Sequence, residues 1–201
     1  MKYTYLVLIF TCTNLLLAFV LPIIRLYKST GVFPVNFNKA DVIQSFIGKV
    51  YGVCLLLLFI SAICLAFFSE AYLFLNPFTY LTSPAFYIPG LILNQLAVIW
   101  IMIGQKQMEN SWRIGIYDNE KNKLIISGMY KYSRHPIFLG LMLLLFSSFM
   151  CMPNAITFAI CVVGFVLIQI EAHLEEIELT TKHGEEYLNY CKKTNRWINI
   201  F

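Results

Sequence analysis

Long stretches without charge dominate the chain. Asp, Glu, Lys and Arg are absent from residues 3–24, 50–69, 71–105 and 136–170. Each stretch reaches the roughly 20 residues that a helix needs to cross a bilayer. The pattern predicts an all-α integral membrane protein. The first stretch exceeds the core of a secretion signal and lacks a small-x-small cleavage site, so we expect it to be a retained span.

Two of these stretches are long enough to be divided at proline and turn residues. Pro77, Pro84 and Pro89 predict a loop or interfacial segment, followed by a span over about residues 86–104. Met152-Pro153-Asn154 is a turn signal within the last stretch. It predicts a helical hairpin whose two arms have about 16 residues each, which is short for spans.

The pattern as a whole predicts about five transmembrane helices. We place three of them in residues 1–104, and the hairpin in a second region, residues 105–201. Fourteen of the fifteen basic residues then fall on one side of the membrane, with only Lys2 on the other. Because Lys and Arg near short loops prefer the cytoplasm, we expect the N-terminus outside and the C-terminus inside.

Composition also predicts a membrane protein, and it argues against a nucleic-acid partner, a disulfide framework and a metal site. The 201 residues are 59% hydrophobic and 13% charged, against roughly 25% charged in soluble domains. The net charge of +4 comes from residues beside the ends of apolar runs, so we expect no nucleic-acid partner. The six cysteines form no C-x-x-C pair and three scattered histidines lack ligand spacing, so neither a disulfide framework nor a metal site is expected.

Polar residues gather on either side of the predicted hairpin, in residues 105–135 and 171–196. The hairpin returns the chain to the side it left, so the two groups should meet at the cytoplasmic face. Arg134 and His135 precede Pro136, which suits a first helical turn. At a helix N-terminus they favour an anion such as a carboxylate; alternatively, they only mark the membrane surface.

A row of glutamates begins inside the last predicted span. Glu171, Glu175 and Glu178 share one helical face and suit a cation. Ionisable groups at the inner end of a span are suspected of function, which favours roles for Glu171 and Glu175. For Glu176 and Glu178 we expect an exposed extension paired with Lys182.

Several ordered blocks between Gln105 and Trp197 resemble the isoprenylcysteine carboxyl methyltransferase family in its broad sense, which includes bacterial members and is related to phospholipid methyltransferases. The blocks are Ser111-Trp112-Arg113-Ile114-Gly115, Leu124-Ile125-Ile126-Ser127-Gly128-Met129-Tyr130, Arg134-His135-Pro136-Ile137-Phe138-Leu139-Gly140, Glu175-Glu176-Ile177-Glu178-Leu179, His183-Gly184-Glu185-Glu186-Tyr187, Tyr190 and Arg196-Trp197. The resemblance implies a multi-pass helical fold that encloses S-adenosylmethionine in a cytoplasmic pocket and takes a lipophilic acceptor from the bilayer.

The resemblance also implies the residues of the site. Carried over by position, the cofactor would contact Asn122, Lys123, Leu124, Ile125, Tyr130, His135, Pro136, Ile137, Phe138 and Glu175. Arg134 and Glu171 are the expected catalytic residues. Phe138 stands where Tyr is common, so one hydroxyl contact is missing. Relatives that methylate prenylated cysteine have Arg at the position of Glu171, where it holds the substrate carboxylate.

The expected function is methyl transfer from S-adenosylmethionine to an O, N or S atom of a lipophilic acceptor. Glu171 would repel a carboxylate acceptor, whereas it could orient or accept the proton of an amine, hydroxyl or thiol. One alternative is a sterol or steroid reductase using NADPH, although Ile137 and Phe138 replace the usual Asn and Tyr. Another is a non-catalytic lipid-binding membrane protein, which would not need two polar clusters.

Overall fold

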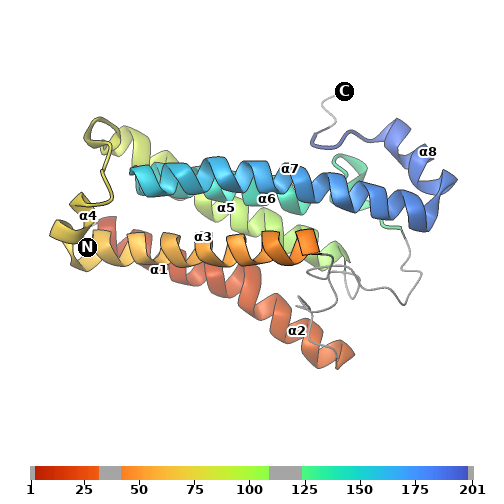
Figure 1. Ribbon diagram of the computed structural model, residues 1–201, viewed down its shortest axis with the longest axis horizontal. Helices are drawn as coiled ribbons and strands as arrows, with labels where there is room; N and C mark the ends of the chain where they lie inside the picture. Colours follow the sequence, from red (N-terminus) through yellow and green to blue (C-terminus); the bar gives the residue numbers. More distant parts are fainter. Residues whose placement is uncertain (1–2, 32–41, 109–123, 199–201) are drawn as a thin grey trace.

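The charge-free sequence forms long helices in the computed structural model (Figure 1). The structure describes residues 3–31, 42–108 and 124–198. In these ranges the only strand-like pairing is an isolated bridge between Pro77 and Asn154. The helices are α1 (Tyr3–Leu15), the π-helix η1 (Leu16–Val20), α2 (Leu21–Thr30), α3 (Val42–Phe67), α4 (Ser69–Leu73), the 3-10 helix η2 (Thr79–Leu81), α5 (Pro84–Met108), the 3-10 helix η4 (Gly128–Lys131), α6 (Pro136–Cys151), α7 (Ala155–His183) and α8 (Glu185–Lys193).

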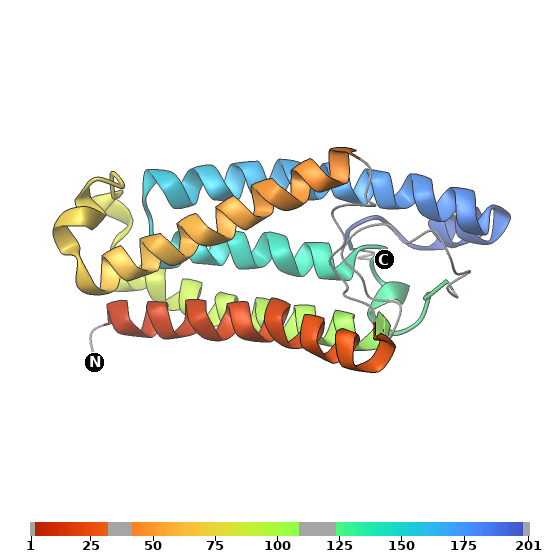
Figure 2. The same cartoon turned by 60° about the horizontal axis from the view of Figure 1, so that its bottom comes forward.

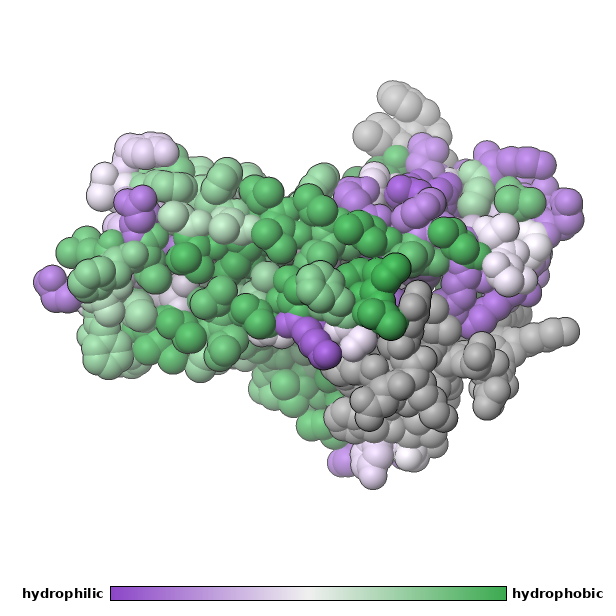
Figure 3. Space-filling model, in the orientation of Figure 1, coloured by the Kyte–Doolittle hydropathy of each residue, from purple (hydrophilic) through white to green (hydrophobic). Residues whose placement is uncertain are grey.

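The helices include the membrane spans that the sequence predicts. Four are long and apolar enough to cross a bilayer, over Tyr3–Ser29, Val42–Phe67, Pro84–Met108 and Ala155–His183, and α6 is a shorter apolar helix. Apolar side chains cover the middle of the molecule and polar ones gather at one end (Figure 3). The prediction of an all-α membrane protein with about five membrane helices is confirmed.

The hairpin has its tip where it was predicted, but its second arm is longer. Asn154 caps α7 by accepting from the Thr157 amide at 2.9 Å. From there α7 runs for 29 residues rather than about 16, through the glutamates to His183. The prediction was wrong because it ended the helix where the apolar run ends. Glu and Leu are good helix formers, so the change to charged residues marks the membrane boundary, not the end of the helix.

A contact with α5 compensates for a break in the first span. Pro22 has no amide hydrogen, so it leaves the carbonyl of Ala18 without its usual helical donor. The turn widens into η1 just before this proline. Gln105 of α5 donates its side-chain amide to the Ala18 carbonyl at 2.9 Å. A backbone group in the membrane interior is thereby satisfied, as it must be where water is scarce.

Close packing of α5 on α6 fixes the start of α6. A Cβ added to Gly140 would lie 2.6 Å from Cγ1 of Ile101, and one on Gly104 would lie 2.8 Å from Cγ1 of Ile137. Small residues at such crossings let helix backbones approach closely in membranes. Trp100 adds a hydrogen bond from its indole nitrogen to the Pro136 carbonyl at 2.8 Å. The residues just before α6 are therefore held at one end of the bundle.

Buried amides join α1 to this pair. Asn14 donates to Asn94 at 2.5 Å, and Asn94 donates to Ser147 of α6 at 3.0 Å. Each polar group thus finds a partner inside the bundle, as apolar surroundings require. The hairpin tip and α4 lie at one end of the molecule, and α8 with the polar residues around it lies at the other (Figure 2).

Candidate functional site

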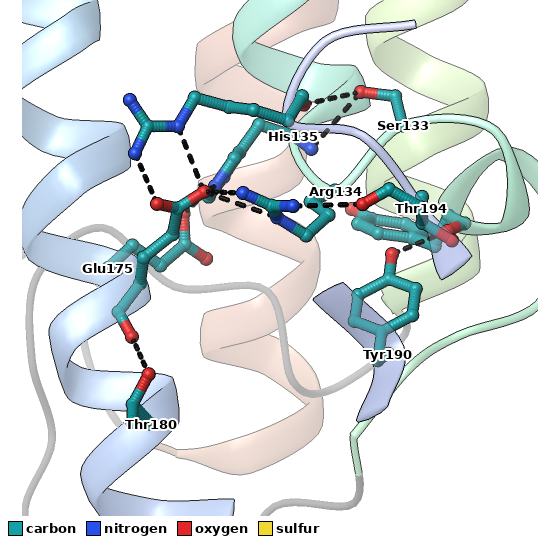
Figure 4. A network of polar contacts seen from close by, with 10 residues as sticks. Ser133, Arg134, His135, Glu175, Thr180, Tyr190 and Thr194 are labelled. Atoms are coloured by element: carbon teal, nitrogen blue, oxygen red, sulfur yellow. Dashed lines mark hydrogen bonds and ion pairs between the residues drawn. The ribbon is translucent and has the colours of Figure 1, made fainter. Parts of the chain in front are cut away.

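The two predicted polar groups meet at one end of the bundle. The residues before α6, the second half of α7 and the segment after α8 form one network of polar contacts (Figure 4). Pro136 occupies the first turn of α6, as predicted. The hairpin brings the chain back beside its starting point, which is why residues some 40 positions apart share this network.

Glu176 lies at the centre of the network. Arg134 donates to its carboxylate from Nε at 3.2 Å and from Nη2 at 2.6 Å. Arg196 donates from Nε at 3.0 Å and also from Nη2. The Glu176 side chain is 14% exposed. A carboxylate so placed is stabilised by two guanidinium groups, in the planar geometry that arginine offers.

The segment after α8 is attached to the start of α6 through its backbone. The amides of Arg134 and His135 donate to the carbonyls of Asn195 at 3.0 Å and Arg196 at 3.3 Å. Nη1 of Arg134 donates to the Thr194 carbonyl at 2.9 Å. Arg134 therefore uses all three of its side-chain nitrogens on Glu176 and Thr194. We call residues 194–197 the tail segment.

His135 is held between two carboxylates. Its Nδ1 lies 3.2 Å from Glu175 and its Nε2 lies 3.3 Å from Glu176, while the side chain is only 2% exposed. Burial disfavours the charged ring, but the hydrogen bonds to Glu175 and Glu176 outweigh it, so the pKa of His135 is raised above its ordinary value. The ring also stacks on Phe138, with centroids 5.5 Å apart. His135 is therefore stabilised as an imidazolium.

Unlike Glu176, Glu175 has a carboxylate that can still accept hydrogen bonds. Its side chain is 38% exposed, and His135 is its only hydrogen-bond partner among the described residues. Tyr130 lies within electrostatic range of Glu175, and burial followed by Glu175 raises the pKa of the Tyr130 hydroxyl. Tyr190 donates to the Tyr130 carbonyl and fixes η4 in place. Glu175 can thus accept further hydrogen bonds from a ligand.

The other residues expected at the cofactor line the same region or fall outside the described ranges. Leu124 is buried with Tyr187 and Tyr190, and Ile125 is half-buried. Pro136 is buried, and Ile137 packs on Gly104. Asn122 and Lys123 lie outside the described residues.

Glu176 is not where the sequence predicted it. We expected an exposed residue, but it is the most highly connected carboxylate of the described residues. Its neighbour Glu178 does pair with Lys182 as predicted. The two glutamates are close in sequence but two residues apart on α7, so their side chains point about 200° apart, to nearly opposite faces of the helix. Arg196, one of the residues that carry the family resemblance, could have indicated a buried carboxylate partner. No spacing rule, however, connects Arg196 to a particular residue of α7.

The geometry agrees with two comparisons. Residues 87–181, which include most of α5, all of α6 and nearly all of α7, match the model of the isoprenylcysteine carboxyl methyltransferase (ICMT) family. This region of the chain is therefore similar to the ICMT family. A methanethiol S-methyltransferase of a Pseudomonas species is 33% identical over 97 residues, which are 48% of this chain and 36% of that protein. The ICMT-family match covers Arg134, His135, Glu175 and Glu176, so the resemblance read from the sequence is confirmed.

Proposed function

We propose that the protein is an S-adenosylmethionine-dependent methyltransferase of the membrane, acting on a lipophilic acceptor. The observation that carries the proposal is the pairing of His135 with Glu175 and Glu176, built within the region that matches the ICMT family. The Pseudomonas relative is named for methyl transfer to a thiol, which supports the same reaction type. Since the chain spans about a third of that relative, its activity supports this one only by similarity.

The donor set fits a cationic cofactor. Glu175 has free acceptor capacity and is partly exposed, so it suits the ammonium, the sulfonium or a ribose hydroxyl. Tyr130, within electrostatic range of Glu175, and Leu124, which packs with Tyr187 and Tyr190, are buried side chains that suit an adenine ring. Arg134 is already committed to Glu176 and Thr194, so we assign it to the wall of the site rather than to the cofactor's carboxylate.

The cofactor supplies a methyl group already activated by a positive sulfur. The chain then needs mainly to align the acceptor and exclude water, which proximity achieves without a protein nucleophile. In this proposal Glu175 anchors the cofactor and His135 orients Glu175. Arg134 and Glu176 fix the tail segment beside them. Glu171, one helical turn before Glu175 and half-buried, lies beside the acceptor and receives its proton.

Ligand-dependent thermal stability of the detergent-solubilised protein tests the assignment. We expect S-adenosylhomocysteine to raise the unfolding temperature in a saturable way and NADPH to leave it unchanged. Stabilisation by NADPH alone would indicate a reductase. Stabilisation by neither compound would contradict the proposal and favour a non-catalytic role.

A further inference from the structure

Tyr51 is a tyrosine near Glu171 to which the proposed function assigns no role. Tyr51 lies on α3, outside residues 87–181 that match the ICMT family. The buried residues Ile47, Cys54 and Leu58 lie three to seven positions from it, so Tyr51 belongs to the stripe that α3 turns toward the bundle. Its side chain therefore points into the protein, not into lipid.

Glu171 continues the corresponding stripe of α7. Gly164, Leu167 and Ile168 are buried at helical spacing before it, and Glu175 follows one turn later. The first half of α3 crosses the second half of α7 (Figure 2), and the two helices pack directly. The Tyr51 hydroxyl and the Glu171 carboxylate lie within electrostatic range of each other across this contact. The two polar groups thus share one place between the helices.

The Glu171 carboxylate lacks the partners that Glu176 has. Within the described ranges it forms no ion pair or hydrogen bond, and the charged neighbour that acts on it is Glu175, one turn along α7. A half-buried carboxylate without a cation is unfavourable in a membrane helix and points to a ligand or a proton-transfer role. Its position one turn from Glu175 places that ligand next to the proposed cofactor.

We infer that Tyr51 and Glu171 together bind the head group of a neutral acceptor that loses a proton on methylation, foremost a thiol on an apolar chain. This inference rests on the proposed function. The acceptor sulfur forms a bond to the methyl carbon, and the bond from that carbon to the cofactor sulfur breaks, leaving its electron pair on the cofactor. Glu171 takes the thiol proton, while Tyr51 donates a hydrogen bond to the developing thiolate.

The chemistry of the pair selects among head groups. A carboxylate would be repelled by Glu171 and Glu175. An amine is an ammonium at neutral pH and cannot attack until it has lost that proton, whereas a thiol is neutral, nucleophilic and more acidic than a hydroxyl. The thiol therefore demands least from a carboxylate base.

Matched twelve-carbon probes test the inference with the full chain in detergent. Formation of S-adenosylhomocysteine is measured with 1-dodecanethiol, 1-dodecanol, dodecylamine and dodecanoic acid, and affinity for S-adenosylhomocysteine is measured separately. We expect dodecanethiol to be turned over fastest and dodecanoic acid not at all. Glu171→Gln should lower kcat for the thiol about 100-fold or more. Tyr51→Phe should lower kcat about two- to tenfold.

Two readouts separate these roles from structural ones. The Glu171→Gln defect should shrink at strongly alkaline pH, where the thiol ionises without a base. Both variants should keep wild-type affinity for S-adenosylhomocysteine. Tyr72→Phe, which alters a buried tyrosine hydrogen-bonded to Asn154 at the opposite end, should change stability but not kcat.

Each contrary result has a defined meaning. Preferred methylation of dodecanoic acid, or unchanged kcat in both variants, would overturn the inference. So would binding of S-adenosylhomocysteine with turnover of none of the four probes, a result that leaves the cofactor assignment standing. Failure to bind S-adenosylhomocysteine would instead contradict the proposed function itself.

Discussion

Replacing Glu176 by Gln tests whether one carboxylate holds the tail segment. The change keeps the shape of the side chain but removes the charge that Arg134, Arg196 and His135 share. Breaking a buried ion pair costs about 3 to 5 kcal/mol. Arg196 is 33% exposed and water can replace part of its interaction, so we expect a loss of about 2 to 4 kcal/mol in the free energy of unfolding.

The assay is thermal unfolding in detergent, combined with limited trypsin digestion. A loss of this size should lower the unfolding temperature by roughly 5 to 15 °C for a chain of this length. Cleavage after Lys192, Lys193 and Arg196 should accelerate as the tail segment loosens. Glu178→Gln is the matched control, since its pair with Lys182 lies within one helix and is worth about 0.5 kcal/mol or less. Equal stability and equal digestion of the two variants would refute the reasoning.

Three further predictions follow from the described contacts. The pKa of His135 is raised in the folded protein, so its protonation contributes stability that is fully present below about pH 6.5 and is lost as the pH rises through the folded-state pKa. The unfolding temperature of the wild type should therefore fall more steeply with alkaline pH than that of His135→Asn. Gly140→Ala places a Cβ against Ile101 and should cost about 1 to 3 kcal/mol in unfolding measurements, whereas Gly52→Ala, with nothing within 4 Å of the added Cβ, should not destabilise. In a cysteine-free background on intact cells, an impermeant thiol reagent should label Phe74→Cys but not Lys192→Cys. The reason is that basic residues favour the cytoplasm and gather at the end that contains Lys192. Labelling of Lys192→Cys alone would show the opposite topology.

The choice of Phe74 as a reporter shows one limit of the sequence. Cys151 lies at the hairpin tip, but its side chain is 3% exposed and packs near Gly90. A thiol reagent would not reach it, whereas Phe74 at the same end is 90% exposed. The topology itself stays a prediction, as does the division into residues 1–104 and 105–201.

The spans and the hairpin could be predicted because the membrane imposes length and apolarity on every helix. The turn at Met152-Pro153-Asn154 could be predicted from its proline and asparagine, and the meeting of the two polar groups from the return of the chain through the hairpin. The partners of Glu176 could not be predicted from the sequence, because they depend on how the tail segment after α8 folds back on α6. The role of Tyr51 was equally hidden, since its relation to Glu171 depends on the crossing of α3 and α7 and not on local spacing.

The central proposal is that Glu175, oriented by His135, binds S-adenosylmethionine, and calorimetry on the solubilised protein tests it most directly. Wild-type protein should bind the cofactor at one site. Glu175→Gln should weaken binding by about 10- to 150-fold, the equivalent of losing one charge-assisted hydrogen bond of about 1.5 to 3 kcal/mol. His135→Ala should weaken it comparably, and Glu178→Gln should leave it unchanged. Equal affinities in the wild type and all three variants would contradict the account.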